Sequence, residues 1–210
     1  MFNYFFNWSR RSLLTGLLIA AWLGLVATGF AFWERYDSTP GQAERADSSP
    51  PSTHRGWELV LFAHPQCPCT RASLGELAEL AHQAGPNLAI RVVFVRPDDA
   101  PEGWEHSELW SMAVAIPGVQ VSCDPDGSEA RRSGATTSGH LILYDPLGRV
   151  AFYGGITRGR GRVGESSARQ TILALLAGSE PAIRETPVFG CALVNSDACH
   201  DREKTTPCQQ

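Results

Sequence analysis

A strand–helix–strand pattern near the middle of the sequence limits the possible folds most strongly. Two apolar runs of strand length, residues 57–63 and 88–95, flank residues 70–84, where apolar side chains recur at helical spacing. Gly85-Pro86-Asn87 then predicts the end of that helix. Two buried strands joined by a helix pair in parallel through a right-handed crossover. The pattern therefore predicts an α/β domain with a central sheet flanked by helices.

Further elements follow in an order that completes one domain over residues 57–178. We expect helices over 105–116, 128–133 and 166–177, and strands over 119–122, 140–144 and 149–153. The turn Asp145-Pro146-Leu147-Gly148 predicts a hairpin between the last two strands. The expected fold class is thus α/β with a mixed sheet, because a hairpin adds antiparallel strands to the parallel pair.

An uncharged apolar stretch near the N-terminus, residues 12–33, predicts a transmembrane anchor. A helix needs about 20 apolar residues to span a bilayer. Arg10 and Arg11 precede the stretch, so the positive-inside rule predicts a cytoplasmic segment at 1–11 and an extracytoplasmic, periplasmic domain on a single-pass protein of the inner or plasma membrane. A cleaved signal peptide is the alternative, but Gly29-Phe30-Ala31 is a poor small-x-small cleavage site.

Two polar segments flank the predicted domain. Residues 34–56 contain Pro, Ser, Gly and charged residues, which predicts a flexible tether. Residues 179–210 form a cysteine-containing C-terminal tail. Within that tail, residues 186–193 form an apolar patch that could dock back on the domain. The net charge of −4 provides no broad basic surface, so we expect no nucleic-acid partner.

The cysteine content indicates redox or metal chemistry. Six cysteines in 210 residues are too few for a small disulfide scaffold. Two of them, Cys67 and Cys69, lie where the first strand meets the first helix. Backbone N–H groups at a helix N-terminus stabilise a thiolate, so the pKa of a thiol falls there. A more populated thiolate attacks a partner disulfide more often.

The sequence around these cysteines resembles the active site of the thioredoxin-like superfamily. The likeness begins at Phe62-Ala63-His64-Pro65-Gln66-Cys67-Pro68-Cys69, which resembles the family's strand–turn–helix. Residues 134–144 resemble the loop and strand that face the active site, residues 145–149 the hairpin turn, and Tyr153-Gly154-Gly155 the glycine that follows. The resemblance implies a membrane-anchored thiol-disulfide oxidoreductase without a cofactor, acting on extracytoplasmic protein thiols or disulfides. It also implies catalytic roles for Cys67 and Cys69 and a substrate-facing loop of Pro68, Ser138, Gly139 and His140.

Two features depart from the family pattern. The family places two residues between its cysteines, whereas only Pro68 intervenes here. Either Gln66 takes the place of the attacking cysteine or Cys67 attacks from a turn one residue shorter, and we favour Cys67. A disulfide across a single residue closes a strained ring, which predicts an oxidising couple. The family's cis-proline is replaced by Gly139.

Two other functions use the same residues. Two thiolates one residue apart suit Cu(I), and His140 or His64 could add a nitrogen ligand. In outline the chain is similar to membrane-anchored thioredoxin-like copper chaperones, which predicts Cys67, Cys69 and His140 as an alternative copper site. The second alternative is a non-catalytic binding module whose cysteines form only a structural clasp.

The remaining cysteines and an arginine-rich loop have simpler interpretations. Cys123 follows a short strand and is expected to be buried. For Cys191 we favour a structural bridge with Cys199 or Cys208 over a resolving role toward the two active-site cysteines. Three arginines that alternate with glycine are expected to form a solvated loop, with an anion or lipid contact as the minor option. These are Arg158, Arg160 and Arg162.

Overall fold

The computed structural model describes residues 2–42, 56–97, 100–164 and 166–193, with side chains from residue 10 onward. It divides into two units, one ending at Thr39 and one beginning at Pro40. The first unit consists of helix α1 (Phe2–Ser38), which is longer at both ends than the predicted membrane span of 12–33. Of the described helices, one (Arg10–Ser38) is long and apolar enough to cross a membrane, and a signal sequence meets the same criteria.

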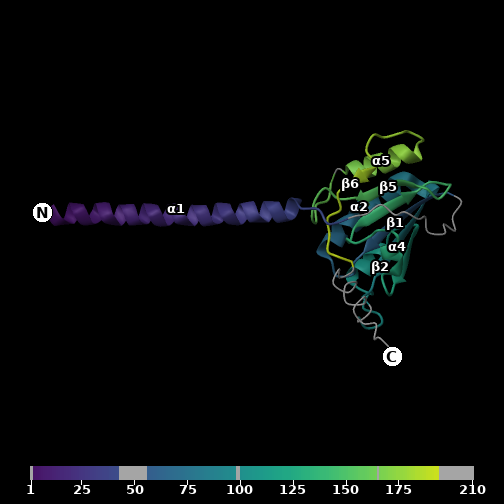
Figure 1. The fold of residues 1–210 in the computed structure, drawn as a ribbon, viewed down its shortest axis with the longest axis horizontal. Coiled ribbons are helices and arrows are strands. Elements are labelled where there is room, and N and C mark those ends of the chain that lie inside the picture. The colour runs from purple at the N-terminus through teal and green to yellow at the C-terminus, as the bar shows by residue number, and fades with distance from the viewer. Residues whose placement is uncertain (1, 43–55, 98–99, 165, 194–210) are drawn as a thin grey trace, which may run out of the picture. The chain divides into compact units, whose positions relative to one another are not determined.

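The second unit is built on a six-stranded mixed sheet (Figure 1). In chain order its strands are β1 (Trp57–Ala63), β2 (Leu88–Val95), β3 (Val119–Asp124), β4 (His140–Tyr144), β5 (Val150–Gly155) and β6 (Glu185–Thr186). Their spatial order is β3-β2-β1-β4-β5-β6. The first three strands are parallel, β4 runs antiparallel to both β1 and β5, and β6 is parallel to β5. The predicted parallel pair, the hairpin and the α/β class are confirmed.

Five helical segments connect the strands. They are α2 (Pro68–Ala84), the 3₁₀ turn η1 (Gly85–Asn87), α3 (Glu108–Val114), α4 (Ser128–Arg132) and α5 (Ser167–Leu176). Helix α5 lies beside β5 and β6 (Figure 1). Helix α3 begins three residues later than the predicted 105, because Ser107 caps it: the Ser107 hydroxyl accepts a hydrogen bond from the Trp110 N–H at 3.4 Å.

The sheet separates two apolar layers. Consecutive side chains of a strand point to opposite faces, so both faces of β1 contribute to the core. The layer under α2, α3 and α5 contains Leu59, Leu61, Leu74, Leu77, Leu80, Val92, Phe94, Leu141, Leu143, Phe152 and Ile172. The opposite layer contains Val60, Phe62, Val93, Val95, Ala130, Ala135, Ile142, Tyr144 and Leu193. Burial on both faces explains why β1 and β2 read as continuous apolar runs.

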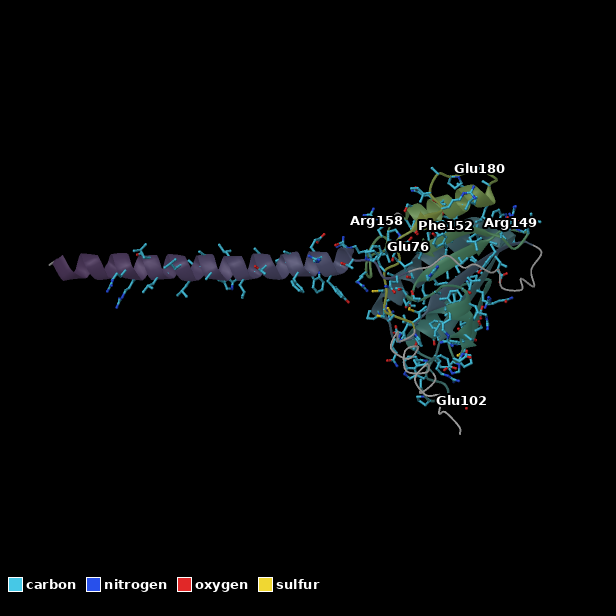
Figure 2. All side chains as sticks on the ribbon, in the orientation of Figure 1. Glu76, Glu102, Arg149, Phe152, Arg158 and Glu180 are labelled. Atoms are coloured by element: carbon cyan, nitrogen blue, oxygen red, sulfur yellow. The ribbon has the colours of Figure 1, made fainter. Side chains whose placement is uncertain are left out.

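A buried ion pair joins α2 to α5. Glu76 of α2, labelled in Figure 2, is 5% exposed, and its Oε2 lies 2.6 Å from Nη1 of Arg169 in α5. Its other carboxylate oxygen accepts a hydrogen bond from the Gly164 N–H at 2.6 Å. Glu76 therefore fixes both α5 and the loop that follows β5.

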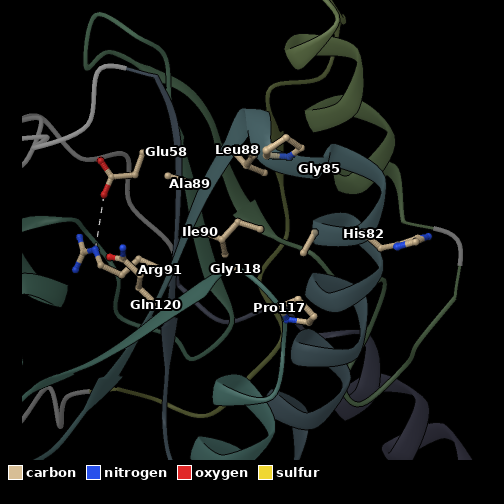
Figure 3. A pocket seen from close by; sticks show the side chains of 12 residues that line it. Glu58, His82, Gly85, Leu88, Ala89, Ile90, Arg91, Pro117, Gly118 and Gln120 are labelled. Carbon is tan, nitrogen blue, oxygen red and sulfur yellow. Dashed lines mark ion pairs between the residues drawn. The ribbon is translucent and has the colours of Figure 1, made fainter.

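A surface hollow lies at the start of β1, the end of that strand remote from the two predicted active-site cysteines (Figure 3). Glu58, His82, Gly85, Arg91 and Pro117 are among the residues that line it. Arg91 pairs there with Glu58 at 3.7 Å. The hollow brings no cysteine into its lining.

Candidate active site

The predicted active-site cysteines lie at the start of α2. Cys67 is the N-cap residue, with extended φ and ψ of −84° and 119°, and Pro68 is the first helical residue. Proline suits that position because its missing N–H would have no partner there. The Cys67 side chain is fully buried, Cys69 is partly buried, and Pro68 is exposed. The helix-start placement that the sequence predicted for both sulfurs is present.

The loop before β4 braces this junction through Ser138. The Ser138 hydroxyl accepts a hydrogen bond from the His64 N–H at 2.9 Å and lies 2.8 Å from the Thr70 hydroxyl. Ser138 is 1% exposed. Its side chain therefore holds the end of β1 and the start of α2 together and is not exposed at the protein surface.

Gly139 lies beside the same helix. Its φ of +90° is a conformation that side chains with a Cβ rarely adopt. A Cβ there would also lie 3.1 Å from the Ser73 hydroxyl of α2. The Gly139 N–H donates to the Phe62 carbonyl at 2.8 Å. Glycine thus allows the loop to approach α2 at the position that the family resemblance assigns to a cis-proline.

The C-terminal segment 188–193, which we call the capping segment, packs against this loop. The Ser138 N–H donates to the Cys191 carbonyl at 2.8 Å, and the Leu193 N–H donates to the Thr136 carbonyl at 2.9 Å. Thr137 and Ala192 form an antiparallel bridge. At its centre, the Cys191 N–H donates to Sγ of Cys67 at 3.4 Å. The capping segment therefore binds the loop like an added strand and lies against the Cys67 sulfur.

The surroundings of Cys67 favour its thiolate. Burial alone would raise the pKa of this thiol. The Cys191 N–H donates a hydrogen bond to the sulfur at 3.4 Å, and the nearby Cys191 thiol and N–H groups of Thr70 and Cys69 also favour the thiolate; together these groups outweigh burial. The net effect lowers the pKa of Cys67 below its ordinary value of 9.0.

The two neighbouring thiols are shifted in the opposite direction. Burial and then the charge on Cys67 raise the pKa of Cys69. Burial, followed by the hydrogen bond to Cys67 and the charges on Cys67 and Cys69, raises the pKa of Cys191 to about 12. Among the three thiols of the site, Cys67 is therefore the one whose thiolate form is favoured.

Arg160 supplies a positive charge to this cluster. Its guanidinium donates to the Gly190 carbonyl at 2.7 Å, and its charge favours the thiolates of Cys69 and Cys191. The sequence predicted a solvated loop for this arginine. In the structure Arg160 is only partly exposed and contacts the capping segment.

The two histidines of the copper hypothesis occupy other positions. His64 Nδ1 accepts a hydrogen bond from the Gln66 N–H at 3.2 Å, within the turn before α2. His140 is fully buried, and its ring lies 6.5 Å from that of Tyr153. Side chains alternate along β4, so His140 shares the face of Ile142, opposite to the face that α2 covers. In the described part of the chain, no three His, Cys, Asp or Glu side chains gather closely enough to hold a metal ion.

Cys123 lies near the end of β3, two strands from β1, and is not among the groups that shift the pKa of the three cluster thiols. Burial and the nearby Glu105 carboxylate raise the pKa of its thiol to about 11. The structure gives Cys67, Cys69, Cys123 and Cys191 as free thiols. Cys199 and Cys208 lie outside the described residues, so the bridge predicted between either of them and Cys191 stays a prediction.

Comparison with solved structures finds chains that share the fold. No protein-family model and no curated protein sequence matches the chain. A hypothetical protein, SMc02350 from Sinorhizobium meliloti, aligns with a TM-score of 0.55 and 21% identity over 75% of this chain and 91% of that one. An uncharacterized conserved protein from Geobacillus kaustophilus aligns with a TM-score of 0.55 and 17% identity over 75% and 89%. The structure of MTB dsbF in mixed oxidized and reduced forms aligns with a TM-score of 0.43 and 16% identity over 59% and 80%.

The class of protein follows from the sheet. Three parallel strands, an antiparallel β4 beside β1 and the hairpin strand β5 form the sheet that the thioredoxin-like resemblance implied. The chain therefore has the strand arrangement of a thioredoxin-like fold, with Cys67 and Cys69 at the start of the first helix of that domain.

Sequence reasoning gave Cys191 a resolving role only as the less favoured option, and it did not place Gly190 or Arg160 in the site. The signal available for the first two was the apolar patch at 186–193, which correctly suggested docking without indicating where. A Cβ on Gly190 would overlap the Ser138 carbonyl oxygen. Gly190, next to Cys191 in that patch, is thus required where the capping segment approaches the backbone of Ser138.

Proposed function

We propose that this protein is a membrane-tethered thiol-disulfide oxidoreductase that acts on extracytoplasmic protein thiols or disulfides. Cys67 is the attacking sulfur and Cys69 lies beside it. The observation that supports this most directly is the position of Cys67 at the N-cap of α2, where the Cys191 N–H and other nearby donors lower the pKa of its thiol despite burial. A thiol of lowered pKa is ionised more often, which makes it a better-populated nucleophile and a better leaving group.

The reaction is a pair of thiol–disulfide exchanges. The Cys67 thiolate attacks one sulfur of a partner disulfide, a Cys67–partner bond forms, and the other partner sulfur leaves as a thiolate. A second thiol, from Cys69 or another neighbouring cysteine, then attacks Sγ of Cys67 and releases the partner. The partner gains two electrons and the chain acquires an internal disulfide. The reverse sequence oxidises a partner dithiol.

The membrane location rests on the N-terminal helix. Residues 10–38 are long and apolar enough to span a bilayer, and Arg10 and Arg11 lie at the N-terminal end of that stretch. The positive-inside rule then places the thioredoxin-like domain outside the cytoplasm, where disulfides persist. Tethering would restrict the enzyme to partners near the membrane surface.

The test is protein-disulfide reduction by the full-length chain in detergent, with a small dithiol as the source of electrons. We expect Cys67→Ser to lower the rate by about 10³-fold, since removal of a nucleophile eliminates the covalent route. Cys123→Ser is the matched control and should keep the rate, because Cys123 is not among the groups that shift the pKa of Cys67. An unchanged rate in Cys67→Ser would contradict the proposal.

The copper chaperone and the binding module remain as alternatives that the same proteins can test. Soft thiolates favour Cu(I), but the described residues do not bring His140 to the two cysteines. Anaerobic metal analysis should give less than one equivalent of bound copper in the wild-type chain. A stoichiometric copper ion lost in Cys67→Ser would favour the chaperone, and full biological activity after replacement of both cysteines by serine would favour the binding module.

A further inference from the structure

The capping segment occupies the place beside the active-site loop where a strand can be added. It pairs with the loop through the hydrogen bonds of Ser138 and Leu193, in the antiparallel manner of a bound peptide. Two glycines permit this approach: a Cβ on Gly155 would overlap the Pro187 carbonyl, and a Cβ on Gly190 would overlap the Ser138 carbonyl. Leu193 is 3% exposed and anchors the end of the segment in the core. The docking is therefore built into both the segment and the surface that receives it.

This docking brings Cys191 to Cys67. The Cys191 thiol lies near enough to the Cys67 sulfur to favour the Cys67 thiolate. The Cys191 N–H lies 3.4 Å from the same sulfur. The Cα of Cys191 is one bond, about 1.46 Å, beyond that nitrogen. A backbone so close to a partner sulfur suits a disulfide, which requires neighbouring Cα atoms.

Cys69 has a less favourable geometry for pairing with Cys67. Cys67 caps α2 and Cys69 lies within its first turn. The Cys69 thiol also lies near the Cys67 sulfur, but residues two apart on a helix do not face each other. A disulfide across one residue also closes a small ring whose dihedral angles are strained. A thiol on a separate strand has no such constraint.

We propose that Cys191 is the second redox thiol of this protein and that Cys67 and Cys191 form its intramolecular disulfide. This inference rests on the proposed function and names the residue that completes the second exchange. Because Cys67 is fully buried beneath the capping segment, that segment must also leave the loop before a partner disulfide can reach the sulfur. The segment thus covers the reduced site and delivers the thiol that resolves the mixed disulfide.

The exchange balances with glutathione disulfide as the oxidant. The Cys67 thiolate attacks one glutathione sulfur, forms a Cys67–glutathione bond and expels the first glutathione thiolate. Formation of that bond removes the charge on Cys67 that opposed ionisation of Cys191. Cys191 then gives its proton to solvent and attacks Sγ of Cys67, which breaks the mixed disulfide and expels the second glutathione thiolate. Two thiols are oxidised and one glutathione disulfide is reduced.

The test treats reduced full-length chains in detergent with glutathione disulfide, then traps free thiols and maps every adduct and disulfide by peptide mass spectrometry. Wild-type protein should yield a Cys67–Cys191 disulfide without an adduct on Cys67. Cys191→Ser should keep one glutathione on Cys67, and the yield of internal disulfide at Cys67 should fall at least tenfold. Cys69→Ser should still close the Cys67–Cys191 bond, and Cys123→Ser serves as the folding-matched control.

The outcomes separate this inference from the proposed function. A Cys67–Cys69 disulfide in Cys191→Ser at the wild-type yield would overturn the role of Cys191 and leave the oxidoreductase intact. A bond between Cys191 and Cys199 or Cys208 in the oxidised wild-type chain would overturn it as well. Absence of both a glutathione adduct and an internal disulfide at Cys67 in Cys191→Ser would instead contradict Cys67 as the attacking sulfur, and with it the proposed function.

Discussion

The start of α2 and the capping segment act on the same sulfur in different ways. The helix start places Cys67 at an N-cap and provides the N–H groups of Thr70 and Cys69. The capping segment covers the sulfur and provides the thiol and N–H of Cys191, a residue 124 positions away in the sequence. The pKa of the Cys67 thiol is therefore lowered both by the helix start, which adjoins it in sequence, and by the distant capping segment. Of these two, only the capping segment can move away from the sulfur.

The difference explains why neighbouring thiols have opposite tendencies. Cys69 is two residues from Cys67, yet the pKa of its thiol is raised by burial and by the charge on Cys67. It does not receive the hydrogen bonds that Cys191 provides to Cys67. Contacts with the capping segment, more than proximity to the helix start, thus distinguish the two sulfurs.

Displacement of the capping segment should have the largest effect on the difference between these two regions, because it exposes Cys67. In Gly190→Ala the new Cβ would overlap the Ser138 carbonyl, so the segment must move away from the loop. We expect alkylation of Cys67 by iodoacetamide to accelerate on the order of tenfold or more. In this variant the reagent reaches the sulfur without waiting for the capping segment to open. Gly75→Ala, on α2 with its nearest non-local atom 3.8 Å from a Cβ, is the matched control. Equal alkylation rates in wild type and Gly190→Ala would show that the segment does not shield the sulfur.

Loss of the buried ion pair should test how firmly the helix start is held. Glu76→Gln leaves the Arg169 guanidinium beside α2 without its carboxylate, and the expected loss is about 3 kcal/mol of unfolding free energy. Glu79→Gln, an exposed position on the same helix, should change stability by no more than about 0.5 kcal/mol. Chemical denaturation measures both. Similar midpoints for the two variants would mean that the Glu76 pair contributes little.

Acid should destabilise the domain through His140 on the other face of the sheet. Burial lowers the pKa of this ring from 6.5 to about 4. Between these values the unfolded chain binds a proton that the folded chain does not, so the free energy of unfolding falls as pH falls from 6.5 to 4. The loss attributable to His140 is about 3 kcal/mol at the lower end.

Denaturation of His140→Phe across that pH range measures this contribution. The variant should lose this part of the pH dependence, whatever its absolute stability. His82→Gln, at an exposed position of α2, should keep it. A pH dependence of His140→Phe equal to that of the wild type would assign the acid sensitivity to other groups.

Removal of the Arg160 charge should have the smallest effect of these changes. Arg160→Gln eliminates a charge that favours the thiolates of Cys69 and Cys191, so the pKa of both thiols should rise further. We expect alkylation of Cys69 at fixed pH to slow by about twofold. Arg158→Gln, exposed in the same loop, is the control. An identical rate for both variants would remove Arg160 from the electrostatics of the site.

Much of the fold was predictable because its signals are local. Strands Trp57–Ala63 and Leu88–Val95 match the predicted bounds, since continuous apolar runs mark strands that are buried on both faces. Strand β6, with two residues, has too little periodicity to detect. The end of α1 at Ser38 and the contact of Gly41 with Val188 lie within the predicted tether, whose residues 43–55 are outside the described part of the chain.

The sequence predicted only the part of the site that is contiguous in the chain. Cys67 and Cys69 could be placed because a strand and a helix adjoin them in sequence. Cys191 could not, because its position depends on a backbone approach that Gly190 permits and on a receiving loop 50 or so residues earlier. Long-range docking of an irregular segment leaves no periodic pattern to find.

The most direct test of the account is the pH dependence of Cys67 alkylation in the full-length wild-type chain, resolved from the other cysteines by peptide mass spectrometry. The rate follows the thiolate population, so its midpoint gives the pKa of Cys67. We predict a midpoint below 9.0, the ordinary value, and below that of Cys69. A midpoint at or above 9.0 would contradict the claim that this sulfur is prepared for nucleophilic attack.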